Sequence, residues 1–233
     1  MKITFWNVCD DITEQKYNHI KTFKSDILIL SEVRGKSFEN LMNDWDYSLW
    51  YNDSLYEKHD YGIVIFSNEY KIEFTDNFNR NFRYVIPLKV SDKNGNFQFY
   101  LFAVWTKDKP LKYFKNIINA LDFPGYKEYI EQGAIFIGDF NTNVTEKNKT
   151  EYDNIINKGL IDCAKEILLP TYSHTKEENF FTADYCLATQ DMIKRFTIDE
   201  KIEHFDKSIK SKLKYKGMSD HCVIGCEIVN LSQ

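Results

Sequence analysis

Short apolar runs separated by polar, turn-forming residues recur along the whole chain. Runs of strand length and strand pattern occur at Ile3–Val8, Asp26–Leu30, Gly62–Phe66, Tyr84–Val90, Phe97–Val104, Ala134–Ile137, Asp184–Ala188 and Cys222–Val229. Apolar residues at three- and four-residue spacing predict helices over Thr13–Phe23, Ser37–Asp44, Leu111–Leu121, Tyr126–Gln132 and Glu151–Lys158. The strands Tyr84–Val90 and Phe97–Val104 are joined by a turn-rich segment without a helix, so a mixed α/β fold with antiparallel strand pairs is expected.

The same pattern indicates one domain. No internal repeat or low-complexity linker interrupts the chain, so we expect residues 1–233 to form a single domain. The polar stretch Thr142–Asn148 and the Lys-rich stretch Lys201–Lys216 are typical of surface loops, and the second is long enough to carry function.

Composition excludes several classes of protein. Hydrophobic residues make up 43% of the 233 residues, and only 4 Pro and 9 Gly are present, which argues against a disordered or collagen-like chain. No apolar run approaches the roughly 20 residues that span a bilayer, and Ile3–Val8 lacks the flanks of a signal peptide. The five scattered cysteines then predict reduced thiols in a cytoplasmic protein, with no zinc-type ligand spacing.

The charge balance is acidic. The formal net charge is −5, so long-range attraction to a polyanion is not a property of the whole molecule. Binding of nucleic acid would require a local basic patch or a metal ion.

Polar side chains stand repeatedly where apolar strands end. These places are Trp6-Asn7-Val8, Leu30-Ser31-Glu32, Gly138-Asp139-Phe140-Asn141, Ala183-Asp184-Tyr185 and Ser219-Asp220-His221. Each has an ordinary structural explanation when taken alone: Glu32 as a solvated carboxylate, Gly138–Asn141 as a tight turn, His221 as a histidine satisfied in the core.

Taken together and in order, the five motifs resemble those of the endonuclease/exonuclease/phosphatase family. The matching positions extend from Asn7 to His221, and the most specific are Gly-Asp-Phe-Asn after a strand and the late Ser-Asp-His. The resemblance implies a deoxyribonuclease I-like fold, a four-layer α/β/β/α sandwich of two mixed sheets, with a phosphoester-hydrolysing site at one end.

The resemblance also implies a role for each matching residue. Glu32 would be the principal Mg²⁺ ligand, with Asn7 and Asp220 at or near the metal. Asp139 would orient or deprotonate the attacking water, and Asn141 would hydrogen-bond the phosphoryl group. His221 would contact the scissile phosphate and be steadied by Asp184.

The chemistry of these residue types agrees with that assignment. Mg²⁺ prefers hard oxygen ligands and keeps several waters, so one or two carboxylates suffice, and Mn²⁺ is an alternative metal. Phosphodiester hydrolysis needs a positioned water and charge neutralisation at the phosphoryl oxygens, which Asp139 and His221 could supply together with a metal. A His–Asp pair favours the protonated imidazole that suits a phosphate contact.

The chain departs from the family pattern at several positions. Trp105 stands where the family usually has a His or Tyr that touches the phosphate; it is either a substrate contact or a residue packed in the core. Cys9 stands where several family members have an acidic residue, which puts metal ligation there in doubt. Arg83, with Arg80, is a candidate to supply a phosphate-binding charge, unless it is simply solvated.

The function expected from the sequence is a Mg²⁺-dependent phosphoesterase, foremost a phosphodiester hydrolase of nuclease type. A phosphomonoesterase and a catalytically impaired phosphate- or nucleotide-binding module on the same fold are the alternatives, and a chance coincidence of motifs is remote. Nucleic acid or a small phosphoester is the expected substrate, and a monomer without a membrane span is the expected state. The choice of substrate depends on loops, which the fold does not determine.

Overall fold

Two six-stranded sheets form the centre of the molecule in a computed structural model, which describes residues 1–52, 60–107, 112–165, 170–174, 179–190, 192–198 and 218–229. The first sheet has the order β13-β14-β1-β2-β4-β3, formed by Ile193–Ile198, Ile224–Ile228, Lys2–Asn7, Ile27–Arg34, Tyr61–Ser67 and Tyr47–Tyr51. The second has the order β5-β6-β7-β8-β12-β9, formed by Lys71–Phe74, Val85–Ser91, Phe97–Trp105, Ala134–Asp139, Asp184–Thr189 and Leu160–Asp162. Both sheets are mixed, because β1–β2 and β7–β8 are parallel and the other pairs are antiparallel.

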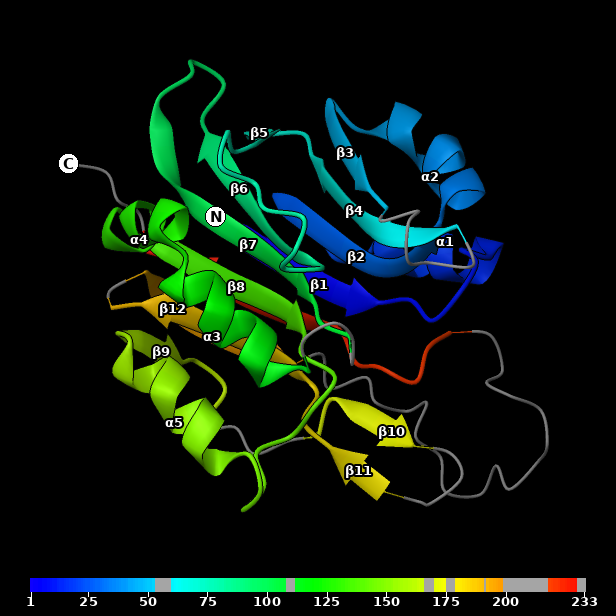
Figure 1. The fold of residues 1–233 in the computed structure, drawn as a ribbon. Helices are drawn as coiled ribbons and strands as arrows, with labels where there is room; N and C mark the ends of the chain where they lie inside the picture. The colour runs from blue at the N-terminus through cyan, green and yellow to red at the C-terminus, as the bar shows by residue number, and fades with distance from the viewer. Residues whose placement is uncertain are drawn as a thin grey trace.

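Helices cover the outer faces of the two sheets (Figure 1). The first sheet carries α1 (Glu14–Ile20) and α2 (Gly35–Leu41), which is followed by a 3-10 turn at Met42–Asp44. The second sheet carries α3 (Phe114–Asp122), α4 (Pro124–Glu131) and α5 (Lys149–Asn157). The expected four-layer α/β/β/α sandwich is therefore confirmed, with a deoxyribonuclease I-like arrangement of the layers.

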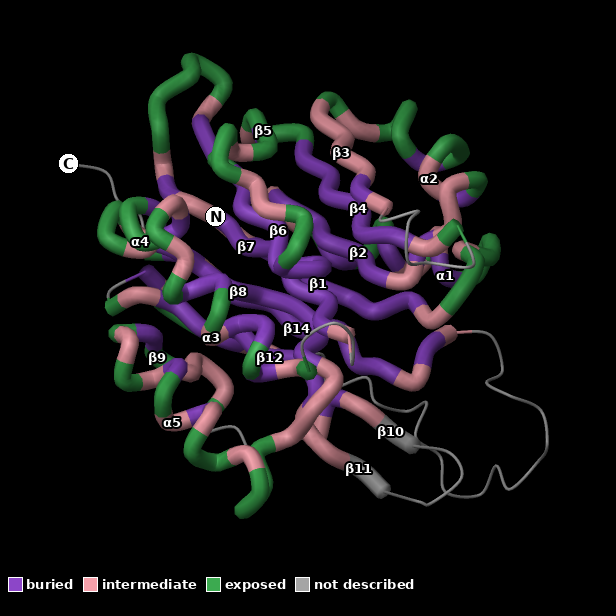
Figure 2. The backbone as a smooth tube through the Cα atoms, in the orientation of Figure 1, coloured by how far each residue is buried: buried purple, intermediate pink, exposed green. Residues whose placement is uncertain are grey.

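The core occupies three interfaces. The largest cluster lies between the sheets and includes Phe5, Ile29, Leu88 and Leu101; two others lie between each sheet and its helices. Figure 2 shows the central strands buried along nearly their whole length, while the loops and outer helix faces are exposed. Continuous burial on both faces explains why these strands read as unbroken apolar runs in the sequence.

Every strand expected from the sequence is present. The structure adds six strands that the pattern did not indicate: β3, β5, β9, β13 and the separate hairpin of β10 (Tyr172–His174) and β11 (Asn179–Phe181). The expected helices are present with shorter or shifted bounds, and the segment Lys201–Lys216 lies outside the described residues. Among the described residues, no helix is long and apolar enough to cross a membrane.

Candidate active site

Adjacent strands bring several of the expected residues to one end of the second sheet. Asp139, the last residue of β8, is directly paired with Trp105 at the end of β7 and with Asp184 at the start of β12. In the first sheet, Asn7 ends β1 opposite Ser31 of β2. Since β1 and β8 face each other across the sandwich, their final polar side chains meet: Nδ2 of Asn7 donates to Oδ2 of Asp139 at 3.0 Å.

Glu32 reaches this point because its strand is bulged. The pairing of β2 with β4 shifts register between Ser31 and Val33, and Glu32, the residue between them, has a left-handed backbone with φ 58°. A bulge turns a side chain away from the alternation of the strand. The Glu32 carboxylate thereby accepts a hydrogen bond from Nδ2 of Asn7 at 3.1 Å.

The Gly-Asp-Phe-Asn motif forms a tight exit from β8. Gly138 has φ 153°, and a Cβ on it would lie 1.9 Å from the Val104 carbonyl oxygen, so glycine permits the close approach of β7. Phe140 is fully buried and packs on Tyr185, which anchors the turn. Asn141, with φ 52°, donates to Asp139 from both its backbone N–H (2.7 Å) and its Nδ2 (2.8 Å).

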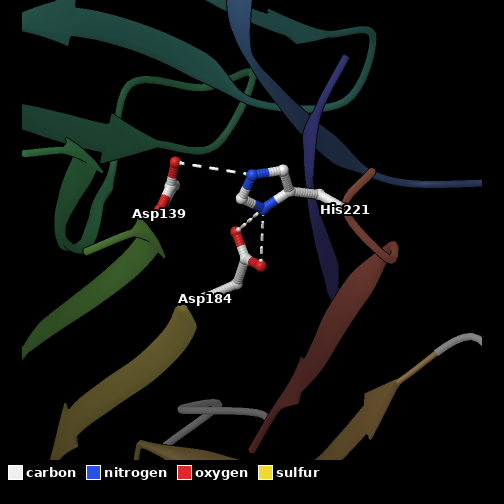
Figure 3. Close-up of side chains that lie close together, drawn as sticks. All are labelled: Asp139, Asp184 and His221. Atoms are coloured by element: carbon white, nitrogen blue, oxygen red, sulfur yellow. Dashed lines mark hydrogen bonds and ion pairs between the residues drawn. The ribbon is translucent and has the colours of Figure 1, made fainter. Parts of the chain in front are cut away.

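His221 and Asp184 form a buried pair, shown with Asp139 in Figure 3. Nδ1 of His221 lies 2.9 Å from Oδ2 and 3.1 Å from Oδ1 of Asp184, and Nε2 lies 3.9 Å from Oδ2 of Asp139. The backbone of His221 is also held, since its N–H donates to Oγ of Ser219 and its carbonyl accepts from Nε1 of Trp6. The imidazole therefore has a fixed place between two carboxylates.

The electrostatics of this cluster favour a charged imidazole. Burial lowers the pKa of His221, but the carboxylates of Asp184 and Asp139 outweigh that effect and raise the pKa to about 10. Burial raises the pKa of Asp139 to about 7, against the opposing effect of the His221 charge. Near neutral pH the site thus contains a proton donor and a carboxylate close to its own titration point.

Hard oxygen donors suitable for a divalent cation lie on the Asn7 side of the cluster. Glu32 is only partly buried, and Oδ1 of Asp220 is a buried oxygen that has no hydrogen-bond partner among the described residues, as expected of an atom that has a role other than internal pairing. The residues fit Mg²⁺, which needs few carboxylates. Oδ1 of Asn7 accepts from the Cys9 N–H at 3.0 Å, so Asn7 acts mainly through its two carboxylate contacts.

A second group of donors also lies close enough to hold a metal. Ligand atoms of Asp139, Asp184 and His221 all lie within 4.8 Å of one another. The raised pKa of His221 makes this group less suitable for a cation, since a metal ligand must be a neutral imidazole. Cys9 is equally unsuited at neutral pH, because burial and the carboxylates of Asp220 and Glu32 raise the pKa of its thiol to about 12.

Trp105, which is paired with Asp139, and Arg83 are both buried. Trp105 is 1% exposed, its ring packs on Tyr84 at 4.6 Å, and Lys107 covers it with Nζ 3.3 Å from the ring centre. Its Nε1 is buried and has no hydrogen-bond partner in the part of the chain that the structure describes. Arg83 is also buried, with its guanidinium 5.7 Å from the Tyr84 ring and its carbonyl bound by Asn116. Neither side chain is a solvated surface group.

Other residues support the site without having been identified from the sequence. Oγ1 of the buried Thr171 accepts the N–H groups of Ala183 and Asp184, and its carbonyl accepts the Cys222 N–H. It therefore ties together the segments that carry Asp184 and His221. Lys16, also buried, donates from Nζ to the carbonyls of Val8 and Asp11 and so holds the turn after β1. A lone Thr after Pro170 and a helical Lys gave no sequence signal for these roles.

Comparisons with known proteins agree with the fold. No protein-family model matches the sequence, and no match was found among curated protein sequences. Solved structures do match over 98% of this chain and 99% of theirs. They include a 3′-5′ exonuclease from Neisseria meningitidis (18% identity, TM-score 0.67), a mannosyl-6-phosphatase from Bacteroides thetaiotaomicron (14%, 0.65) and an AP endonuclease from Archaeoglobus fulgidus (17%, 0.64).

The similarity spans the full sandwich, so it extends beyond the motifs at the ends of the strands. Another solved structure, from Leptotrichia buccalis, is described as an endonuclease/exonuclease/phosphatase family protein and matches at 18% identity with a TM-score of 0.64. At these identities the comparison establishes the architecture. The chain has the fold of the endonuclease/exonuclease/phosphatase proteins.

Proposed function

We propose that the protein is a metal-dependent phosphoesterase that hydrolyses phosphodiesters. The observation that carries the proposal is the buried arrangement of Asp139 between the His221–Asp184 pair and the Asn7–Glu32 pair. Burying two carboxylates and an imidazole at one end of a fold costs stability, so such a cluster points to a functional role. The names of the structural neighbours, which include nucleases and a phosphatase, support the same reaction class.

In this mechanism each residue has a distinct task. His221, charged and fixed by Asp184, donates a hydrogen bond to a phosphoryl oxygen and neutralises its charge. Asp139 accepts a proton from the attacking water, which suits a carboxylate whose pKa is raised to about 7. Nδ2 of Asn141 already donates to Asp139 and the Thr106 carbonyl, so Asn141 orients the base as well as contacting phosphate.

The metal-binding part of the proposal concerns Glu32 and Asp220. These carboxylates would hold Mg²⁺, with Mn²⁺ as the alternative, and Asn7 would keep Glu32 in place. When bound, the cation supplies Lewis-acid stabilisation of the phosphoryl and leaving-group oxygens. The protein residues contribute the proton transfers and the orientation of the ester.

Hydrolysis of bis(p-nitrophenyl) phosphate tests the proposal directly. The wild-type protein should release p-nitrophenol with Mg²⁺ or Mn²⁺ and stop doing so with a chelator. His221→Ala and Asp139→Asn should each lower kcat by about 100-fold or more, because each removes a group that acts on the reacting atoms. Wild-type inactivity on phosphodiesters, with activity on phosphomonoesters, would replace this proposal with that of a phosphomonoesterase. Inactivity on both, without metal binding, would indicate a binding module.

A further inference from the structure

Three cysteines from separate segments meet between the two sheets. Cys186 of β12 and Cys226 of β14 are buried on the inner faces of the second and first sheets, and Cys163, which directly follows β9, packs against the same core. Contacts with the thiols of Cys163 and Cys226, together with burial, raise the pKa of the Cys186 thiol well above its usual range. None of the three thiols takes part in the proposed hydrolysis, so the cluster requires an explanation of its own.

Cys163 and Cys186 lie directly opposite each other in the second sheet. The pairing of β9 with β12 sets Asp162 opposite Leu187, and the next pair in that register is Cys163 and Cys186. The N–H of Cys163 continues the ladder by donating to the Cys186 carbonyl at 2.9 Å. In a hydrogen-bonded antiparallel pair the Cα atoms are about 5.5 Å apart, which is within the range of about 4.4–6.8 Å that a disulfide spans. Directly opposed side chains also share a face of the sheet, so the two sulfur atoms can bond.

Cys226 touches the same thiol but comes from the facing sheet. Packed sheets lie about 10 Å apart, whereas a disulfide tolerates a Cα separation of at most about 7 Å. A bond between Cys186 and Cys226 would therefore require the two backbones to approach each other. The buried neighbours of Cys226 on β14, Ile224 and Ile228, fill the space between the sheets and oppose that movement. Cys163 is thus the partner that the geometry favours.

Solvent reaches one member of the pair. Cys163 is partly exposed, and its Sγ donates to the Ile161 carbonyl at 3.7 Å. Ile161, two residues earlier on the same face of the edge strand, is 49% exposed, so the inner face of the sandwich is open along this edge. Cys186 is fully buried behind it. A small oxidant would meet Cys163 first, with a second thiol already in place beside it, which is the arrangement typical of redox-sensitive cysteines.

We propose that Cys163 and Cys186 form an oxidation site, at which a peroxide converts the two thiols into a reversible disulfide between β9 and β12. Hydrogen peroxide oxidises the Cys163 sulfur to a sulfenic acid and is itself reduced to water. The Cys186 sulfur then bonds to the Cys163 sulfur, the S–O bond breaks, and the hydroxyl leaves with the Cys186 proton as a second water. One peroxide and two thiols thus give one disulfide and two waters. The inference does not depend on the proposed function, although the new bond would lie two residues from Asp184.

Reversibility follows from the geometry of the pair. The Cβ atoms of directly opposed residues are about 4.5–5.5 Å apart, whereas a disulfide holds them at about 3.8 Å, so the strands must tighten when the bond forms. Such strain makes a disulfide easier to reduce. Reduced glutathione should therefore reopen it, whereas an unstrained structural disulfide resists glutathione.

Thiol counting and peptide mapping of the whole chain test the inference. The fully reduced protein is treated with hydrogen peroxide, blocked with N-ethylmaleimide in denaturant and digested. Two of the five thiols per chain should be lost, and mass spectrometry should find one linked peptide pair, containing Cys163 and Cys186. Reduced glutathione should restore all five thiols under native conditions. A Cys186–Cys226 link, a link between chains, or no loss of thiols would overturn the inference, and a Cys163–Cys186 link that glutathione leaves intact would overturn its reversibility.

Variants distinguish the attacked thiol from the responding one. Cys186→Ala should leave Cys163 as a sulfenic acid, which dimedone traps at that residue, whereas dimedone should label the wild type at least about tenfold less. Absence of dimedone at Cys163 in this variant would overturn the proposed order of steps.

A substitution at the partly exposed position keeps the test decisive where Cys186→Ala does not fold. Cys163→Ser should form no disulfide under the same treatment and keep its four remaining thiols. Cys9→Ser is the matched control, because it removes another partly buried thiol and should form the Cys163–Cys186 link to the same extent as the wild type. Loss of two thiols in Cys163→Ser, or loss of the link in Cys9→Ser, would overturn the assignment of the pair.

Discussion

Individual residues of the site are held by contacts that leave them little freedom. His221 is fixed at its ring by Asp184 and at its backbone by Ser219. Asp139 accepts from both Asn7 and Asn141, so its carboxylate cannot rotate without breaking several hydrogen bonds. In the proposed reaction such preorganisation would lower the cost of reaching the transition state, because the groups would not have to reorient.

The His221–Asp184 pair leads to a prediction about titration. Burial alone would lower the pKa of His221, and Asp184 is the largest of the effects that raise it to about 10. Asp184→Asn should therefore let the imidazole lose its proton at a much lower pH, and kcat should fall on the alkaline side first. Imidazole ¹H–¹⁵N spectra recorded across pH would measure this, with His19 on α1 as the internal control. If the titration midpoint of His221 were unchanged in Asp184→Asn, Asp184 would not be the residue that raises the pKa of this imidazole.

Glu32 allows a separate test of metal binding. Glu32→Gln preserves the size of the side chain and its contact with Asn7 but removes the charge, so Mg²⁺ affinity measured by calorimetry should fall about tenfold or more. Glu73→Gln, on the edge strand β5, is the control and should bind Mg²⁺ like the wild type. Equal affinity in Glu32→Gln and the wild type would remove Glu32 from the ligands.

At the scale of elements, the site depends on local irregularities of the strands. Glu32 lies on a bulge of β2, and Asp139 follows the close approach of β8 to β7 at Gly138. The β10–β11 hairpin joins the site through Thr171 and through the pairing of Tyr172 with His221. Regular strands would alternate their side chains between the two faces, so these departures bring together residues that a regular sheet would separate.

Gly138→Ala should show how much the close approach of β8 to β7 contributes to the free energy of unfolding. The added Cβ would overlap the Val104 carbonyl oxygen, so the strands must separate at a cost of about 3 kcal/mol in the free energy of unfolding. Gly95→Ala also has a positive φ but nothing within 4 Å, and should cost about 1 kcal/mol. Urea unfolding measures both, and equal losses would show that only the backbone conformation matters.

At the scale of the whole molecule, the central strands of the sandwich could be predicted from the sequence, whereas its edge strands could not. The central strands are buried on both faces, so apolar runs such as Ala134–Ile137 predicted them; the edge strand β5, with one buried residue in four, left no such pattern. Site residues such as Asp139 and His221 could be named from their place at strand ends. The bulge at Glu32 and the support from Thr171 could not, because both depend on contacts between distant segments.

Stability of the whole molecule should respond to the metal. Glu32 and Asp220 lie close to the buried Asp139 cluster in a chain of net charge −5. A cation that binds only the folded state stabilises it by an amount that rises with the logarithm of the cation concentration above the Kd. At a Mg²⁺ concentration about 100 times the Kd, the gain is about 2.7 kcal/mol, which corresponds to a rise in Tm of roughly 5–11 °C for a chain of this size. Scanning calorimetry across Mg²⁺ concentrations would measure the rise, with the same series on Glu32→Gln to separate the site from general screening by salt. A rise of equal size in the variant would show that the cation acts on surface charge and that the site at Glu32 does not bind it.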